Sequence, residues 1–279
     1  MDHTTRLQEW ENEWATTMGA FVPEEGRVWF RDQDLHRDLD AESWMGLLAF
    51  GVTGRRFSVE QLELFSGLWK LAVSYPDPRL WNNRIGALAG TTRSTANLGM
   101  TAGLAISDAT LFGHRPDVGA FEFLLRAQRA LDSGLELDTI VMKELQDNRG
   151  IFGYGRPVRS RDERLEPAMK LAQRLGLADG PYTKLAFEVE HILIAHRRRM
   201  YMNSASLNAA LCADQGLSSR EYYYLTLPGF IIGILCCHLD ATEHPPGAFF
   251  PFRCERIDYS GPAPRRWPAA NASPNAGGP

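Results

Sequence analysis

Residues 148–165 read NRGIFGYGRPVRSRDERL, a stretch that combines clustered glycines with several arginines. Three glycines lie close together in it, with two aromatic residues between them. Because glycine tolerates positive φ and lets another backbone approach closely, this part predicts a tight loop. Five arginines flank or follow the loop, and their planar, permanently charged guanidinium groups suit a carboxylate or a phosphate. With Asp162 opening a helix after it, the stretch is a candidate anion site; a solvated basic loop is the alternative.

Composition narrows the classes of protein. A chain of 279 residues with 44% hydrophobic residues is long enough to bury a core, in one large domain or two. The formal net charge of −4 argues against a nucleic-acid partner. The longest apolar stretch, 225–239, contains Pro228 and predicts a buried helix, so we expect no membrane span. Residues 269–279 predict a disordered tail.

The four cysteines of the chain bear on its compartment. They lack the spacing of a zinc site, and two of them are adjacent in the sequence, which makes a poor disulfide framework. We therefore expect reduced thiols, a cytoplasmic location and no bound metal.

Helical periodicity dominates the sequence. Ser58 and Gln61 form a capping box for one of the predicted helices. The segment 95–111 is rich in small residues, which let helices approach closely, and we predict it to be central. Residues 26–30 predict a brief strand or turn. The chain is predicted to be almost entirely α-helical, with helices at 5–18, 41–52, 58–73, 80–89, 95–111, 118–131, 138–147, 164–175, 182–196, 204–215 and 219–240.

Several motifs, taken in order, resemble the citrate synthase and citryl-CoA lyase family. GYGRPV at 153–158 followed by RDER at 161–164 is similar to the family's G-[FY]-G-H-x-V…R-D-P-R segment. MNSAS at 202–206 resembles its N-V-D motif, and RCERIDYSG at 253–261 its R-P-R-x-x-Y-x-G ending. Upstream, GHRP at 113–116 with a following Ala120 looks like H-G-G-A-x-x-A. The resemblance covers roughly residues 27–268, and only the ordered set makes it specific.

The resemblance implies an all-α, citrate-synthase-like fold of two domains. The large domain would comprise residues 1–114 and 223–268, and the small domain residues 115–222. The family is a homodimer with its site in the cleft, and the partner contributes an arginine from the C-terminal segment. Its chemistry condenses an acyl-CoA with a 2-oxo acid, or cleaves the product, with coenzyme A thioester as substrate and no tightly bound cofactor.

Residue by residue, the resemblance assigns candidate roles. His114 aligns with the histidine that stabilises the thioester enolate. The substrate carboxylates would be held by Arg156, Arg164 and Asn203, and by Arg253 or Arg256 near the C-terminus. Arg159 and Arg161 are candidates for the coenzyme A phosphates, with solvated surface arginines as the alternative.

The departures from the family pattern fall on the residues that do its chemistry. Arg156 stands where the second histidine is expected, Ala205 where the catalytic aspartate is expected, and Phe230 where a buried arginine is expected. Removing a positioned general base costs about 10²–10⁴ in rate, so ordinary citrate synthesis is not expected. Asp117 or Glu122 is a candidate for a relocated carboxylate, with solvated helix charges as the alternative.

Two hypotheses follow. In the first, the chain is a repurposed enzyme that acts on an acyl thioester, carried by coenzyme A or a carrier protein, and an anionic carboxylate co-substrate. Permanent charge at Arg156 would suit a more anionic substrate or a developing oxyanion. In the second, the chain is a catalytically degenerate homologue that keeps the helical dimer as a binding or scaffolding protein.

Overall fold

The structure of the chain is a computed structural model. It describes residues 5, 7–8, 11, 14–72, 75–111, 113–156, 161–248 and 253–265. Of the predicted helix at 5–18, the described residues 5, 7–8 and 11 are helical, whereas 14–18 are not, because the chain there leads into a strand. The predicted tail at 269–279 also lies outside them, so its disorder stays a prediction.

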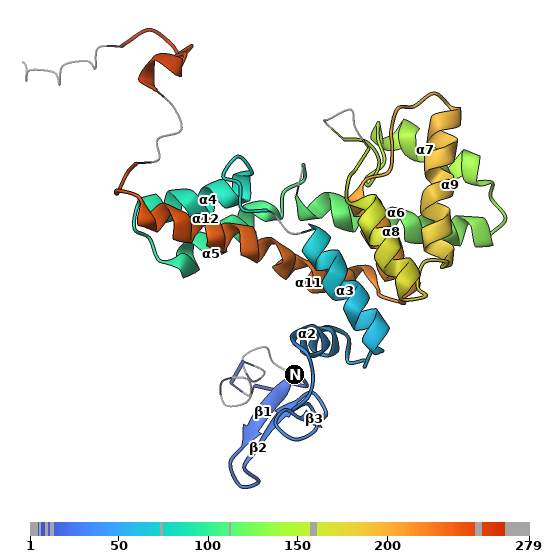
Figure 1. Ribbon diagram of the computed structural model, residues 1–279, viewed down its shortest axis with the longest axis horizontal. Helices are drawn as coiled ribbons and strands as arrows, with labels where there is room; N and C mark the ends of the chain where they lie inside the picture. Colours follow the sequence, from blue (N-terminus) through green and yellow to red (C-terminus); the bar gives the residue numbers. More distant parts are fainter. Residues whose placement is uncertain are drawn as a thin grey trace, which may run out of the picture.

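A small antiparallel sheet comes first, in the order β1-β2-β3. Its strands are β1 Gly19–Val22, β2 Arg27–Phe30 and β3 Gln33–Asp34. The brief strand predicted at 26–30 is therefore confirmed. Figure 1 shows the sheet and the following helix as an arm that extends from the helical body.

The rest of the described chain is helical, which confirms the all-α prediction. The capping box at the start of α3 is present, because Gln61 N–H donates to Ser58 Oγ at 3.3 Å and Ser58 N–H to Gln61 Oε1 at 2.9 Å. The helices are α2 Trp44–Thr53, α3 Val59–Ala72, α4 Trp81–Thr91, α5 Ala96–Ser107, α6 His114–Asp132, α7 Leu137–Asn148, α8 Leu165–Arg174, α9 Pro181–Ala195, α10 Ser204–Asp214, α11 Ser219–Thr226, η1 Leu227–Phe230, α12 Ile231–Glu243 and η2 Cys254–Arg256.

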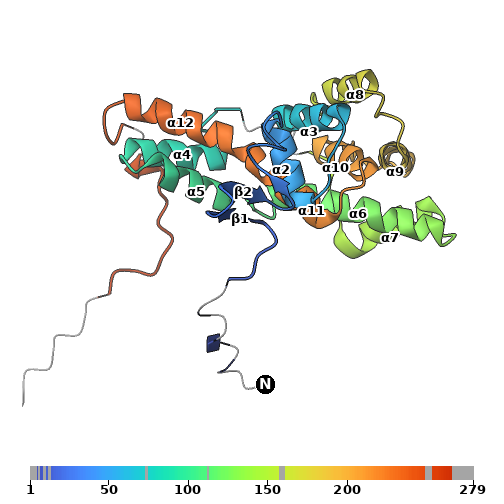
Figure 2. The ribbon, with the colours of Figure 1, turned by 90° about the horizontal axis from the view of Figure 1, so that it is seen from below.

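One helix group surrounds α10, whose residues Ser204, Ala213 and all those between them are buried. Helices α6, α8 and α9 pack directly on α10, and α3 joins the group through α8 and α10. The largest hydrophobic core of the described residues runs through these helices. Figures 1 and 2 place α6–α10 together at one end of the molecule.

A second group consists of α4, α5 and α12, which pack on one another at the other end. A Cβ added to Gly86 of α4 would lie 2.4 Å from the carbonyl oxygen of Ile234 in α12, so these backbones approach closely because Gly86 has no side chain. Helix α5 was predicted to be central, and that prediction is wrong. Its small residues do permit close packing, but only Gly99, Gly103 and Ser107 are buried, and its other face is open.

The C-terminal apolar segment is one helical run, Ser219–Glu243, in which Pro228 sits in the single turn η1. By length and composition alone this run is long and apolar enough to cross a membrane. Only 39% of its most apolar window is buried inside the protein, where α12 packs against α4 and α5, so the predicted buried helix is buried on one face and exposed on the other. Proline is tolerated here because it occupies the first turn of a new helical segment. The predicted domain boundaries at 114 and 222 stay a prediction.

Candidate functional site

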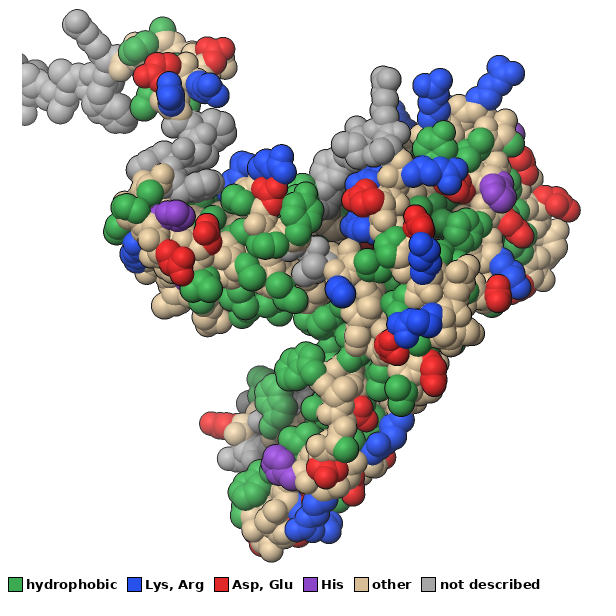
Figure 3. Space-filling view, in the orientation of Figure 1, with side chains coloured by type: hydrophobic (Ala, Val, Ile, Leu, Met, Phe, Trp, Pro, Cys, Tyr) green, Lys and Arg blue, Asp and Glu red, His purple; other side chains and the backbone are tan. Residues whose placement is uncertain are grey.

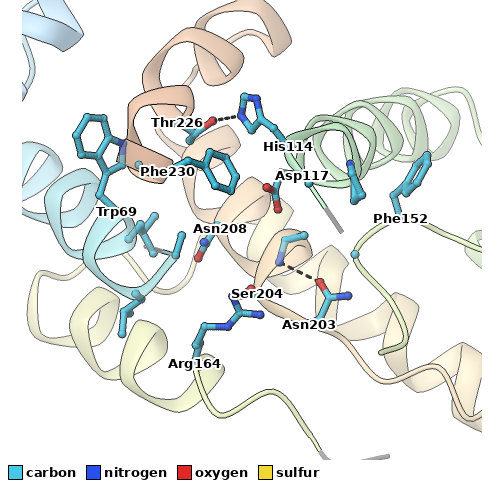
Figure 4. A pocket seen from close by; sticks show the side chains of 18 of the residues that line it. Trp69, His114, Asp117, Phe152, Arg164, Asn203, Ser204, Asn208, Thr226 and Phe230 are labelled. Carbon is cyan, nitrogen blue, oxygen red and sulfur yellow. Dashed lines mark hydrogen bonds between the residues drawn. The ribbon is translucent and has the colours of Figure 1, made fainter. Parts of the chain in front are cut away.

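A pocket of about 830 Å³ lies between the α10 group and the start of the second group. This volume is typical of small-molecule sites. Its walls come from α3, the beginning of α6, the glycine loop at 151–156, α10 and the junction of α11 with η1. Figure 4 shows side chains from these elements pointing into a common space. The pocket includes His114, Arg156, Arg164 and Asn203, so the structure brings four of the predicted site residues together.

The glycine loop forms one wall, and backbone contacts fix it to the start of α10. Asn203 N–H donates to Gly153 O at 2.9 Å, and Gly155 N–H donates to Tyr201 O at 2.7 Å. Gly153 has φ +87°, and a Cβ there would lie 2.6 Å from the Cβ of Ser206. The predicted tight loop with positive φ is therefore confirmed, and its path depends on glycine at 153.

Asn203 was predicted to bind substrate, but the protein uses both ends of its amide. Oδ1 accepts the N–H of Ala205 at 2.9 Å and caps α10, while Nδ2 donates to Gly155 O at 2.8 Å. The residue holds the loop against the helix. Its place in the pocket wall is thus explained without a ligand.

Asp162 organises the arginine side of the pocket. Arg164 donates to it from Nε at 2.8 Å and from Nη2 at 2.7 Å, and the N–H of Ser204 at the start of α10 donates at 2.9 Å. Burial alone would raise the pKa of Asp162, but the hydrogen bonds from Arg164 and Ser204 outweigh burial and hold the pKa at about 2. Asp162 is therefore an ionised anchor that fixes the guanidinium of Arg164 beside the pocket.

The two pocket arginines differ in what they leave free. Arg164 uses Nε and Nη2 for Asp162, so Nη1 has no hydrogen-bond partner among the described residues. Arg156 donates from Nη1 to Glu163 at 2.8 Å and to the carbonyl of Arg161 at 3.3 Å. Arg164 can thus bind a ligand carboxylate with its geometry already set. At Arg156, a ligand would have to compete with the exposed carboxylate of Glu163.

His114 begins α6 and its ring is completely buried. Nε2 lies 2.6 Å from Thr226 Oγ1, and Tyr223 and Phe230 pack on the ring with centroids 4.9 and 5.8 Å away. Burial lowers the pKa to about 4, although Asp108 acts in the opposite direction, so the imidazole is neutral at pH 7. Nδ1 is buried without a hydrogen-bond partner among the described residues.

The proton of Thr226 decides what Nδ1 can do. The hydroxyl has one proton and two acceptors near it, Nε2 of His114 at 2.6 Å and Tyr222 O at 2.7 Å. If Thr226 donates to Nε2, the ring carries its proton on Nδ1 and can donate to a ligand oxygen. If Thr226 donates to Tyr222 O, Nδ1 is an acceptor. Either tautomer leaves Nδ1 buried and without a hydrogen-bond partner among the described residues.

Asp117 lies one turn after His114 and points into the pocket (Figure 4). No hydrogen bond reaches its carboxylate from the described residues, and the Arg164 guanidinium is the charge that acts on it. Burial raises the pKa of Asp117 to about 7, and the attraction of Arg164 reduces that rise. Glu122, the other carboxylate considered, is exposed and accepts a hydrogen bond from Ser219 at 3.1 Å.

The remaining predicted site residues lie elsewhere. Arg161 is exposed, with its guanidinium 5.4 Å from the ring centre of Tyr201. Arg159 lies outside the described residues. Arg253 and Arg256 are exposed in the segment around η2, which Figure 1 shows away from the helical body. Within one chain, the structure does not bring the C-terminal arginines to the pocket.

Two of the positions at which the sequence departs from the citrate synthase pattern line the pocket. Ala205 and Phe230 are both part of its wall. Sequence reasoning missed two further polar residues: Thr226, which is hydrogen-bonded to His114, and Asn208, whose side chain lies at the pocket without a hydrogen-bond partner among the described residues (Figure 4). Asn208 stands one helical turn after Ala205 and therefore on the same face of α10. That spacing was the available signal for Asn208; nothing in the sequence pointed to Thr226.

Comparison with known proteins was made by sequence and by structure. No family model matches the sequence, and neither does any curated protein. Citryl-CoA lyase from Hydrogenobacter thermophilus superimposes with a TM-score of 0.79 at 18% identity, covering 91% of this chain and 97% of that chain. Citrate synthase from Thermoplasma acidophilum, solved with carboxymethyl coenzyme A and oxaloacetate, gives 0.62 at 20% identity over 81% of this chain and 59% of that chain.

A third similar structure is ATP citrate lyase from Methanothrix soehngenii in complex with citrate and coenzyme A. It gives a TM-score of 0.71 at 18% identity over 94% of this chain, which spans 45% of that longer protein. At these identities the likeness shows the fold. The predicted citrate-synthase-like fold is therefore confirmed.

Proposed function

We propose that this protein binds an acyl-CoA thioester together with an anionic carboxylate in the pocket and forms or cleaves a carbon–carbon bond between them by Claisen-type chemistry. The observation that carries this proposal is the pairing, in one pocket, of an anchored Arg164 with a buried imidazole whose Nδ1 is unused. The fold supports it, since similar structures hold citrate and coenzyme A.

Each side of the pocket supplies one requirement of the chemistry. Nη1 of Arg164 would bind the carboxylate of the co-substrate, and Asp162 keeps the guanidinium from following the ligand. Nδ1 of His114 would donate to the thioester oxygen as negative charge develops there, provided Thr226 donates to Nε2. A neutral ring suits this role, because the low pKa keeps a second proton off at pH 7.

Binding and turnover test the proposal separately. Calorimetry with acetyl-CoA, coenzyme A and citrate should show binding. Arg164→Ala should weaken the affinity for citrate by at least about tenfold, because a charged hydrogen bond is lost. Arg126→Ala, which breaks an exposed pair with Glu144, is the matched control and should leave affinity unchanged. A panel of acyl-CoAs with 2-oxo acids then tests for turnover. Absence of both binding and turnover would refute the proposal.

A second candidate function is favoured by the changed residues. Ala205 offers no proton acceptor at the position where the family has its aspartate, and Phe230 packs an apolar ring edge-on against His114. A binding or scaffolding protein of this fold would bind ligand without turning it over. Micromolar binding with no turnover of any thioester would favour this second function over the first.

We also propose a homodimer. Ile232, Leu235 and Leu239 of α12 are exposed at 57%, 37% and 63% and recur at helical spacing, and Leu98 and Ile106 add exposed apolar surface on α5. Figure 3 shows hydrophobic side chains gathered over this end of the molecule. A second copy seated there would cover the stripe, and its C-terminal segment would be the source of the additional arginine, Arg253 or Arg256.

Light scattering measures the assembly directly. The wild-type chain should run at twice the monomer mass, and Ile232→Glu with Leu239→Glu should give a monomer. Val59→Glu, which places a charge at an exposed apolar residue on α3, is the control and should stay dimeric. A monomeric wild type, or a chain that partitions into vesicles through Ser219–Glu243, would refute the dimer.

A further inference from the structure

Resting on the proposed function, we infer that Asp117 is the proton-transferring base of this protein, moved from α10 to the first turn of α6. The position of the family's aspartate is occupied by Ala205, which lines the pocket but has no proton acceptor. Asp117 lines the same pocket from α6, which packs directly on α10, and lies one turn from His114. The pocket thus has no carboxylate at Ala205 of α10 and has one on the neighbouring helix α6.

Apart from its place in the first turn of α6 and the attraction of Arg164, nothing in the described surroundings of Asp117 stabilises a carboxylate. It receives no hydrogen bond from the described residues, and it caps no helix, because it is the fourth residue of α6 and the N-cap is Gly113. A partly buried, ionised carboxylate without donors opposes folding, so a sequence under no functional demand would be more stable with an apolar residue there. Asp162 shows the contrast, because four N–H donors reach that carboxylate.

The charged and titratable groups around Asp117 set when it can accept a proton. Arg164 faces it from the N-cap of α8, Tyr222 lies beside it on α11, and His114 precedes it on α6. Helix α10 contributes the uncharged Ser204 and Asn208 to the same pocket. Burial raises the pKa of Asp117 to about 7 against the pull of Arg164, and a base whose pKa lies near the working pH is effective.

The step balances with the groups present. In bond formation the Asp117 carboxylate takes a proton from the carbon next to the thioester carbonyl, and the C–H electron pair becomes the double bond of an enolate whose oxygen faces His114. That carbon then bonds to the ketone carbon of the co-substrate, the C=O π electrons become an alkoxide, and the alkoxide oxygen takes a proton from solvent water. In cleavage the hydroxyl proton goes to solvent water, the carbon–carbon bond breaks to give the ketone and the enolate, and protonated Asp117 returns a proton to the enolate carbon.

Exchange of the acyl protons for deuterium, followed by NMR, isolates this step from the rest of the reaction. Asp117→Asn keeps the shape of the side chain and should slow both exchange and turnover by about 10²-fold or more, with thioester affinity changed less than about twofold. Glu122→Gln, on the exposed face of the same helix, should have no effect. Adding Ala205→Asp to Asp117→Asn should restore part of the exchange rate, which a merely structural role of Asp117 would not allow.

The pH profile gives a second readout. For the wild type, log(kcat/KM) in the bond-forming direction should fall with unit slope below about pH 7, because the base must be ionised. An Asp117→Asn protein that folds, binds and exchanges at the wild-type rate would overturn the inference and leave the proposed function standing. A wild type that binds thioester but exchanges no proton with any acyl group would overturn both the enzymatic function and the base.

Discussion

The two walls of the pocket each carry an aspartate, and the two carboxylates have opposite surroundings. Asp162, behind the arginine wall, receives hydrogen bonds from Arg164 and from the Ser204 amide, and its pKa lies at about 2. Asp117, on the α6 wall, receives none from the described residues, and its pKa lies at about 7. Burial raises the pKa of both carboxyl groups, and at Asp162 the hydrogen bonds outweigh that effect. Enclosure with donors makes a structural anchor, and enclosure without them makes a group able to exchange a proton near neutral pH.

Removing the anchor should have the largest effect. Asp162→Ala leaves the half-buried guanidinium of Arg164 and the first amide of α10 without their acceptor, and should lower the free energy of unfolding by about 3–5 kcal/mol. Asp138→Ala is the control, because Asp138 makes an exposed contact to His196 at 2.6 Å. This variant should change the free energy of unfolding by less than about 1 kcal/mol. Urea denaturation of both variants at pH 7 measures the difference. Equal losses would mean that Asp162 is no anchor.

The glycine loop on the same wall offers a matched pair of variants. Gly153→Ala places a Cβ against Ser206 at 2.6 Å and forces an L residue to φ +87°, and should cost about 2–4 kcal/mol. Gly155→Ala has a similar φ of +90°, but its Cβ meets only Met200 Cγ at 4.0 Å, so about 1 kcal/mol is expected. Thermal denaturation of both variants separates the clash with Ser206 from backbone strain. Equal losses of stability would show that the close contact with α10 adds nothing to the cost.

The other wall should respond to pH in the opposite sense to Asp162. Because folding raises the pKa of Asp117 from 3.8 to about 7, the folded state binds more protons between these values and loses stability as the pH rises through them. Asp117→Asn lacks this loss, so its advantage over the wild type should grow by about 1–3 kcal/mol between pH 4 and pH 8. Denaturation at both pH values measures it; an advantage that does not change with pH would remove the basis for a raised pKa.

Glu163 should matter least. Its pKa is lowered by the hydrogen bond from Arg156, but its side chain is 71% exposed. Water screens such a pair, so Glu163→Gln should change the free energy of unfolding by less than about 0.5 kcal/mol. Denaturation in low and high salt checks this. If Glu163→Gln lowered the free energy of unfolding by more than about 1 kcal/mol, the Arg156–Glu163 pair would be a structural contact like that of Asp162 and not a screened surface pair.

The sequence predicted the helices and the loop well, because their signals are local. The capping box at Ser58 and Gln61 and the clustered glycines each act within a few residues. It did not predict that α5 lies at the edge, since small residues permit close approach on one face without saying how many faces are covered. It also extended a helix to Met18, where strand pairing with β2 determines the conformation instead.

The candidate site was predicted in part for the same reason. His114, Arg156 and Arg164 were identified by their motifs, and the structure places all three at one pocket. Thr226 was not identified, because it meets His114 only when α11 folds against the start of α6, 112 residues away along the chain. Asn203 was identified as a ligand residue, but its amide is used to hold the glycine loop.

The helical fold, the glycine loop and the set of charged groups available to the pocket could all be predicted from the sequence. Periodicity, turn chemistry and residue type are local properties of the chain. Which of these charged groups pair with one another depends on the tertiary structure. Arg164 lies beside Asp162 two residues away, but the Ser204 amide that completes the anchor comes from another helix. Asp117 is left without donors by the same packing. Protonation depends on burial and on donors in space, and neither is a property of a residue's neighbours in sequence.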